Sequence, residues 1–238
     1  MPLDIRFGDV TTIHIDRPAA ANAFTGAMWS EMAGLCRDIA ARREVKVVVL
    51  SAEGRHFSSG ADTREFAEAY ADPDSTRRYN ALYRDAVRAV AGLAMPVIAA
   101  VQGLAIGGGT ALAAAADLRF CAAEAGFRIT ASKLGIAYSP DDSARLIALI
   151  GPARAKDMLF SARTVAADEA FRWGLADRVV PQEKLAGAVR AYAEEVAGRP
   201  ARSLACCKRI VDGISALPDE RAAPLWQVYA SAFGAPDA

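Results

Sequence analysis

The chain has 238 residues, of which 53% are apolar, which is ample for the buried core of one large domain or two small ones. Lysine and arginine together number 28, as do aspartate and glutamate, so the formal net charge is zero. This balance gives no electrostatic reason to expect binding to nucleic acid or to an anionic membrane.

The cysteines and histidines do not form a metal-binding pattern. They are Cys36, Cys121, Cys206 and Cys207, with His14 and His56. The adjacent pair at 206 and 207 has no metal-ligand spacing, so we expect no metal site, and free thiols are typical of a reducing cytosol. The chain also shows neither a signal-peptide pattern at its start nor a run of eighteen apolar residues. We therefore expect a cytoplasmic protein without a membrane segment.

The first half of the chain predicts a hairpin, a helix and a buried strand. Residues 5–7 and 10–15 alternate as two strands around Gly8-Asp9. Thr25 is placed to cap a helix over residues 27–41. The sequence VKVVVLS at 45–51 is typical of a buried strand.

A glycine-containing loop follows that strand and leads into another predicted helix. The loop contains Gly54 and Gly60, and either Asp62 or Thr63 is placed to cap the helix. The segment that follows, residues 63–92, is charged and alanine-rich and is broken by Pro73.

A second unit of this kind spans residues 97–117. It consists of a short apolar strand at 97–101, a turn at 102–109 and a small, alanine-rich helix at 110–116. The turn contains four glycines, which are Gly103, Gly107, Gly108 and Gly109. Free N–H groups and the positive end of the dipole make such a helix N-terminus suitable for a phosphate, a carboxylate or a developing oxyanion.

Two known uses of such a glycine loop, a phosphate loop and a dinucleotide fingerprint, are disfavoured by the residues that follow the glycines. A phosphate loop needs a lysine after its last glycine, but Thr110 follows Gly109. A dinucleotide fingerprint that starts at Gly107 needs a glycine where the chain has Leu112. An oxyanion hole is left, together with the simpler interpretation of a turn that only packs a helix on a strand.

The second half of the chain is predicted to be mainly helical. Short strands are expected at 118–121 and 127–129, followed by a loop at 134–140. Helices are expected at 141–149, 152–161, 167–174, 184–198, 203–214 and 221–233.

The two strand–glycine–helix units lie about fifty residues apart and can direct two backbone N–H groups at one point. The hexapeptide FSSGAD at 57–62 is similar to the F-x-x-G-A-D motif of the crotonase superfamily, and PVIAAVQG at 96–103 with GGG at 107–109 resembles its second loop. The chain therefore resembles the enoyl-CoA hydratase/isomerase family. Further similarity lies at Arg17-Pro18, Asn22-Ala23, Asp117, Arg119, Gly135, 151–155 and 170–181.

The resemblance implies an α/β fold, a crotonase-like spiral of ββα units. Residues 1–181 would form the spiral core with the acyl-CoA site, and residues 182–238 a C-terminal helical region. In the family such helices join subunits, which implies a homotrimer or a hexamer.

The resemblance also implies an acyl-CoA thioester as the substrate, with no separate cofactor because coenzyme A is part of the substrate. The backbone N–H groups of Ala61 and Gly108 would hold the thioester oxygen. The implied substrate-binding residues around them are Phe57, Ser59, Gly60, Asp62, Gly107 and Gly109. Residues 63–92 would select the acyl group, and the tyrosines there either line its pocket or pack on the core; they are Tyr70, Tyr79 and Tyr83.

The acid–base residues of a hydratase are missing. Ala111 and Ala131 stand where hydratases of the family carry glutamates, and Ser139 stands at a third acidic position. A general base contributes roughly 10²–10⁴-fold to a rate, so loss of both glutamates disfavours hydration. We therefore expect isomerase-like or decarboxylase-like chemistry through a thioester enolate.

Three nearby residues are candidates to replace the glutamates. Tyr138 stands where a methylmalonyl-CoA decarboxylase of the superfamily has a tyrosine, and decarboxylation needs a proton donor rather than a base. Asp141 or Asp142 could serve as the single base for double-bond migration, or could cap the helix after Pro140. Thioester hydrolysis or C–C cleavage in the same hole is a second hypothesis for the chemistry. A non-catalytic subunit that keeps the fold for binding or assembly is a third.

Overall fold

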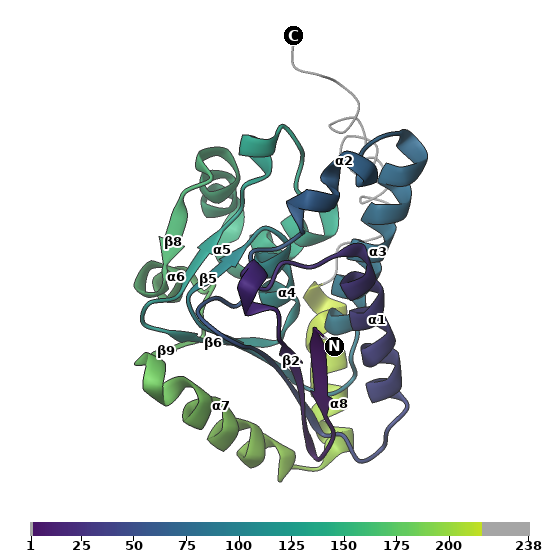
Figure 1. The fold of residues 1–238 in the computed structure, drawn as a ribbon. Helices are drawn as coiled ribbons and strands as arrows, with labels where there is room; N and C mark the ends of the chain where they lie inside the picture. The colour runs from purple at the N-terminus through teal and green to yellow at the C-terminus, as the bar shows by residue number, and fades with distance from the viewer. Residues whose placement is uncertain (1, 216–238) are drawn as a thin grey trace.

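The structure is a computed structural model that describes residues 2–215, and it contains two β-sheets surrounded by helices (Figure 1). The larger sheet has the strand order β1-β2-β3-β4-β6-β9, in which all neighbours are parallel except β1 and β2. Its strands are Leu3–Arg6, Val10–Ile15, Val47–Ala52, Val97–Val101, Leu118–Ala122 and Arg178–Val180, in that order. The smaller sheet has the order β5-β7-β8, with strands Leu104–Ile106, Gly126–Arg128 and Thr164–Ala166.

The helices lie around these sheets. In chain order, α1 to α8 are Gly26–Ala40, Phe66–Ala69, Pro73–Ala91, Gly108–Ala115, Pro140–Ser161, Ala167–Trp173, Gln182–Ala197 and Ala201–Ser215. Helices α1 and α3 pack against each other, whereas α7 contacts strands β2, β3, β4, β6 and β9 of the larger sheet (Figure 1). Short 3-10 turns lie at Pro18–Ala20, Thr63–Glu65 and Ala131–Leu134.

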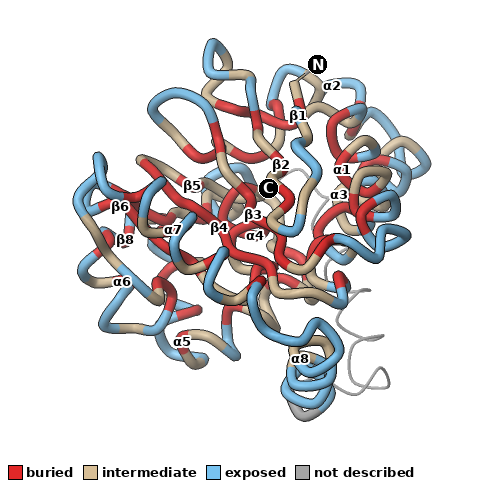
Figure 2. The backbone as a smooth tube through the Cα atoms, turned by 90° about the horizontal axis from the view of Figure 1, so that it is seen from below, coloured by how far each residue is buried: buried red, intermediate tan, exposed pale blue. Residues whose placement is uncertain are grey.

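The core is centred on β3 and β4, as the buried segments in Figure 2 show. All five residues of β4 are buried, which fits an inner strand of a parallel sheet that is covered on both faces. Helix α4 continues this core because it is built of small residues that pack closely. Within residues 2–215, no helix combines the length and hydropathy needed to cross a bilayer.

Most of the predicted elements of the N-terminal half are confirmed. The hairpin pairs Leu3 with Ile15, and Thr25 caps α1 by accepting a hydrogen bond from the Met28 amide at 3.2 Å. Asp62 is the residue that caps the turn after the first glycine loop, since its carboxylate accepts from the Arg64 amide. That turn is the 3-10 helix Thr63–Glu65, which leads directly into α2.

Two predictions of secondary structure differ from the structure, at the turn before α4 and at strands β8 and β9. The turn expected at 102–109 contains strand β5. The two helices expected at 141–149 and 152–161 are both present as the two parts of α5, which is interrupted at Gly151, where φ is 77°. Strands β8 and β9 were not predicted, because three residues are too few to show an alternating pattern. The helix predicted at 221–233 lies outside the described residues.

Candidate active site

Two glycine loops run side by side at the carboxyl ends of β3 and β4. The Ser58 amide donates to the Leu104 carbonyl at 3.2 Å, and the Ile106 amide donates to the Ser58 carbonyl at 2.9 Å. Gly60 has φ +87°, and a Cβ atom there would lie 2.5 Å from the Ile106 carbonyl oxygen. Glycine at position 60 therefore permits the contact between the loops.

The two amides expected to form an oxyanion hole lie where these loops meet. A Cβ atom on Gly60 would be 2.9 Å from the Gly108 nitrogen, so Gly108 directly adjoins the residue before Ala61. Gly108 is the first residue of α4, and the amide of a first helical residue has no acceptor within its helix. Among the described residues, no hydrogen bond engages the amide of Ala61 or of Gly108.

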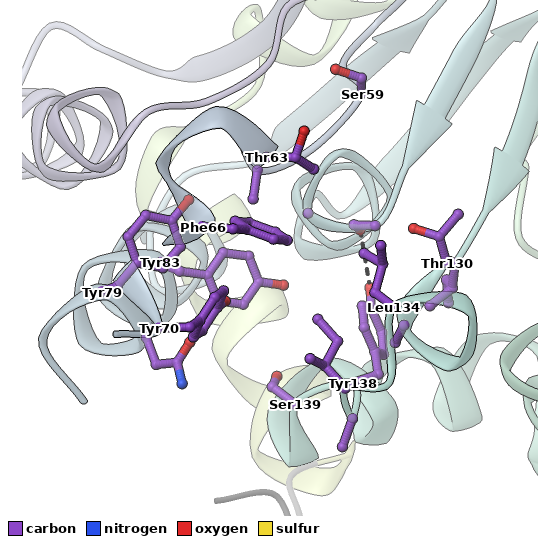
Figure 3. A pocket seen from close by; sticks show the side chains of 18 residues that line it. Ser59, Thr63, Phe66, Tyr70, Tyr79, Tyr83, Thr130, Leu134, Tyr138 and Ser139 are labelled. Carbon is purple, nitrogen blue, oxygen red and sulfur yellow. Dashed lines mark hydrogen bonds between the residues drawn. The ribbon is translucent and has the colours of Figure 1, made fainter. Parts of the chain in front are cut away.

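Both residues line a cleft that encloses about 700 Å³ of empty space, part of it open to solvent. Figure 3 shows Phe66, Tyr70, Tyr79 and Tyr83 on one side of the cleft and Leu134 and Tyr138 on the other. Further lining residues are Ser59, Thr63, Asn80, Gly107, Ile129, Thr130, Ala131, Ile136, Ala137 and Ser139. The cleft is thus mainly apolar and aromatic, with the two loop amides at one point of its wall.

The tyrosines of residues 63–92 contribute to this wall. Tyr79 is buried on α3, and burial raises the pKa of its phenol to about 12. Tyr70 meets Tyr79 edge to face, with ring centroids 5.9 Å apart. The two roles left open by the sequence, lining a pocket and packing on the core, are therefore combined in the same residues.

A buried carboxylate lies behind the aromatic side of the cleft. The Tyr83 hydroxyl donates to Oδ2 of Asp142 at 2.6 Å, and the Ser139 hydroxyl donates to the same oxygen. Asp142 is only 2% exposed, and Arg145 contacts its other oxygen, Oδ1, at 3.2 Å. Burial raises the pKa of Asp142, although the hydrogen bonds from Ser139 and Tyr83 and the charge of Arg145 oppose this shift.

Tyr138 lies on the opposite side, next to the second glycine loop. Its hydroxyl donates to the Gly107 carbonyl at 3.4 Å, which is the dashed contact in Figure 3. The phenol is therefore one residue from the Gly108 amide.

Asp141, by contrast, does not line the cleft, contrary to our prediction of a displaced base. Its carboxylate pairs with Arg88 of α3. Adjacent residues in a helix point about 100° apart, so burial of Asp142 turns Asp141 away. Neither aspartate caps α5, because the cap is Ser139, whose hydroxyl accepts from the Asp142 amide at 3.1 Å.

The other predicted site residues divide into lining and supporting positions. Ser59 and Gly107 line the cleft. Phe57 is fully buried in the core, and Gly109 packs so closely that a Cβ atom would lie 2.3 Å from the Ser58 carbonyl oxygen. Asp62 binds the guanidinium groups of Arg17 at 2.8 Å and Arg64 at 2.7 Å. Asp62 thus holds the first loop against the chain before α1.

The two alanines that stand at the glutamate positions of the family's hydratases, Ala111 and Ala131, differ in their surroundings. Ala131 lines the cleft, and Ala111 is buried in α4 with 1% exposure. Neither methyl group can hold or release a proton. Sequence reasoning missed the contact between Tyr83, which lines the cleft, and the buried Asp142.

Both histidines make hydrogen bonds to neighbouring parts of the fold. His56 Nδ1 accepts from the Leu104 amide at 3.1 Å, and burial lowers the pKa of its ring. His14 contacts Ser51 and Glu53 on and after the neighbouring strand. Over residues 2–215, no three side chains of the metal-ligating types gather at one point.

Known proteins resemble this chain in sequence and in structure. Residues 7–224 match the family described as enoyl-CoA hydratase/isomerase. The carnitinyl-CoA dehydratase of Citrobacter koseri is 35% identical over 216 residues, which are 90% of this chain and 81% of the relative. An enoyl-CoA hydratase/isomerase family protein from Hyphomonas neptunium superposes with a TM-score of 0.88 at 33% identity, covering 96% of this chain and 89% of its own. The enoyl-CoA hydratase of Bacillus anthracis superposes with a TM-score of 0.86 at 28% identity, covering 98% of this chain and 90% of its own.

Proposed function

The chain belongs to the enoyl-CoA hydratase/isomerase family of the crotonase superfamily, and we propose that it stabilises the enolate of an acyl-CoA thioester between the Ala61 and Gly108 amides. The observation that carries this proposal is the pair of unengaged amides at the junction of the two glycine loops. Both residues line a cleft of the right character for an acyl chain.

The chemistry follows from where charge develops. When a bond at the α-carbon of a thioester breaks and leaves its electron pair behind, negative charge moves onto the thioester oxygen. Amides fixed in advance stabilise that charge without reorganising, and removal of one such donor typically costs roughly 10²–10³-fold in rate. Because the donors are backbone groups, the side chain at position 61 need only be small.

The reaction that fits best is isomerisation or decarboxylation rather than hydration. The alanines at 111 and 131 supply no acid or base. In decarboxylation, the C–C bond to carbon dioxide leaves its electron pair in the enolate, so the protein needs only to return one proton to the α-carbon. Tyr138, beside the Gly107 carbonyl, is placed to donate it. Double-bond migration needs one group that takes a proton from the α-carbon and returns it to the γ-carbon.

We also propose that the chain works as a homotrimer or hexamer through its C-terminal helices. Ile210 and Val211 of α8 are 62% and 61% exposed, so this helix offers an apolar surface to a second copy. Light scattering on the purified protein gives the mass in solution, and a monomer at assay concentration would contradict the proposal.

Two measurements test the proposed function. The first is a screen by liquid chromatography with mass-spectrometric detection, which separates isomeric esters of equal mass, with crotonyl-CoA, a β,γ-enoyl-CoA, methylmalonyl-CoA and an aryl-acyl-CoA as substrates. Conversion of the β,γ-enoyl or methylmalonyl ester without hydration of crotonyl-CoA is the expected result, whereas rapid hydration would refute the preferred chemistry.

The second measurement reports on the oxyanion hole without turnover. Sorbyl-CoA carries a conjugated diene on its thioester, and hydrogen bonds to the carbonyl oxygen draw electron density along the diene. We expect a shift of its absorption to longer wavelength on binding. Binding without a shift would place the carbonyl elsewhere and would refute the oxyanion hole.

A further inference from the structure

We propose that Tyr83 is the group that takes the proton from the substrate α-carbon and returns it, and that Asp142 is the positioning residue with which Tyr83 exchanges that proton. This inference rests on the proposed function, because the proton becomes acidic only when the thioester oxygen is held at the Ala61 and Gly108 amides. It assigns the acid–base work to a residue of α3, on a different element from every glutamate position of the family's pattern.

The Tyr83 ring lies beside the proposed oxyanion hole. A Cβ atom on Gly108 would lie 3.2 Å from Cε2 of Tyr83, so the ring edge lies against the residue that carries one of the two amides. Cε2 is bonded to the carbon that bears the hydroxyl. Tyr83 lines the same cleft as Ala61 and Gly108, so we place the α-carbon of a thioester held at Gly108, one bond from the carbonyl carbon, on the side of the cleft that the phenol occupies.

The Tyr83 ring is fixed by its neighbours. Trp29 meets Tyr83 edge to face with centroids 5.0 Å apart, and Trp29 itself stacks on Phe24 at 4.3 Å. Both Trp29 and Phe24 are fully buried. A packed ring holds its hydroxyl in one place, which proton transfer to carbon requires.

The Asp142 carboxylate lies behind the Tyr83 phenol as a proton acceptor. A phenol alone is a weak base near neutral pH because its pKa is about 10. Oδ2 of Asp142 accepts from the Tyr83 hydroxyl at 2.6 Å, so the phenol proton has a carboxylate to move to. Because burial raises the pKa of Asp142, its carboxylate is a stronger base than an exposed aspartate.

Taken together, these contacts define a balanced step. The α-carbon gives its proton to the Tyr83 oxygen while the phenol proton passes to Oδ2 of Asp142. The electron pair of the broken C–H bond forms the enolate, whose oxygen the Ala61 and Gly108 amides hold. In reverse, the same two protons return to the α-carbon or the γ-carbon.

The other groups facing Asp142 are consistent with this role. On α5, Arg145 contacts Oδ1 and leaves Oδ2 to the hydroxyls, while Asp141 repels a charge on Asp142. From α3, the Arg88 guanidinium pairs with the neighbouring Asp141.

The test separates proton transfer from carbonyl binding. Butyryl-CoA is incubated with the protein in deuterium oxide, and mass spectrometry follows uptake of deuterium at the α-carbon. Sorbyl-CoA absorption is measured on the same preparations as the readout of the oxyanion hole. The variants are Tyr83→Phe, Asp142→Asn and Asp142→Glu, with Tyr192→Phe on α7 as the matched loss of a phenol hydroxyl away from the cleft.

We expect Tyr83→Phe to keep the absorption shift and to lose deuterium uptake by about 100-fold or more, in line with the usual contribution of a general base. Asp142→Asn should lose uptake as well and flatten its pH profile, and Asp142→Glu should restore part of it. Tyr192→Phe should match the unmodified protein in both readouts.

Two results would overturn the inference. One is uptake by Tyr83→Phe within threefold of the unmodified protein, and the other is an unmodified protein that shifts the absorption of sorbyl-CoA but does not exchange the α-proton. If the unmodified protein fails to shift the absorption at all, the proposed oxyanion hole is wrong, and the inference that rests on it is overturned with it.

Discussion

Replacement of Gly108 by alanine should impair catalysis more than it impairs folding. The new Cβ atom would lie 3.1 Å from Cη2 and Cζ2 of Trp29 and 3.2 Å from Cε2 of Tyr83. Carbon atoms are best separated by about 3.5–4.0 Å, so three contacts would be too short by several tenths of an ångström. Trp29 is fully buried and stacked on Phe24, which leaves it little room to move.

The magnitude of each effect follows from these contacts. Overpacking a core typically costs about 1–3 kcal/mol, and one methyl group at a helix terminus should lower the free energy of unfolding by about 1 kcal/mol. Relief comes from a shift of the α4 N-terminus or of the Tyr83 ring, and either shift misplaces a group at the oxyanion hole. Loss of one such donor costs roughly 10²–10³-fold, so kcat/KM should fall about 100-fold.

The assay combines urea unfolding with the rate on the substrate that the screen identifies, and with the absorption of bound sorbyl-CoA. Gly187→Ala is the matched control, because Gly187 lies in α7 and a Cβ atom there meets nothing within 4 Å. Alanine is favoured over glycine inside a helix by about 0.5–1 kcal/mol, so the control should be slightly stabilised and fully active. A Gly108→Ala protein with unchanged rate and absorption would refute the placement of the oxyanion hole.

Three further predictions concern stability and thiol chemistry. Hydrogen bonds from Arg64, with further help from Arg17, hold the pKa of Asp62 below its usual range, so its stabilising contribution is present above about pH 4 and is lost as the pH falls through the lowered pKa. Acid unfolding of Asp62→Asn should therefore show a weaker pH dependence below pH 4 than the unmodified protein, and identical curves would contradict this account. Thr25→Ala should lower the free energy of unfolding by about 1 kcal/mol through loss of the cap on the Met28 amide, measured by urea titration. Iodoacetamide should spare the two buried thiols of the folded protein, whose pKa burial raises to about 12, and should label them only after unfolding, as peptide mapping would show. The exposed thiols are Cys206 and Cys207, and the buried ones are Cys36 and Cys121.

The central strands and the glycine loops could be predicted from sequence because their causes are local. A buried parallel strand needs a continuous apolar run, which β4 has, and contact between the loops needs glycine at position 60, which leaves its own mark in the sequence. The Thr25 cap is likewise decided within three residues. Family resemblance then pointed to Ala61 and Gly108.

The acid–base pair could not be found in this way. Tyr83 and Asp142 are 59 residues apart in the chain, and nothing local to either marks the other. The sequence also presents two adjacent aspartates after Pro140, and only the packing of α5 shows that Asp142 is buried and Asp141 is not. The cap was misassigned for a related reason, since serine and aspartate are both good N-caps and helix α5 begins one residue earlier than we expected.

One consequence of this arrangement concerns the engineering of new variants. Helix α3 supplies both the aromatic wall of the cleft and the phenol that we assign to proton transfer. A chimera that receives residues 63–92 from a relative would therefore inherit a new acyl preference and a new acid–base group in a single exchange. Because α3 also packs on α1 and its Tyr83 meets Trp29, such a graft should be compatible only if the donor relative keeps a large aromatic residue at the Trp29 position.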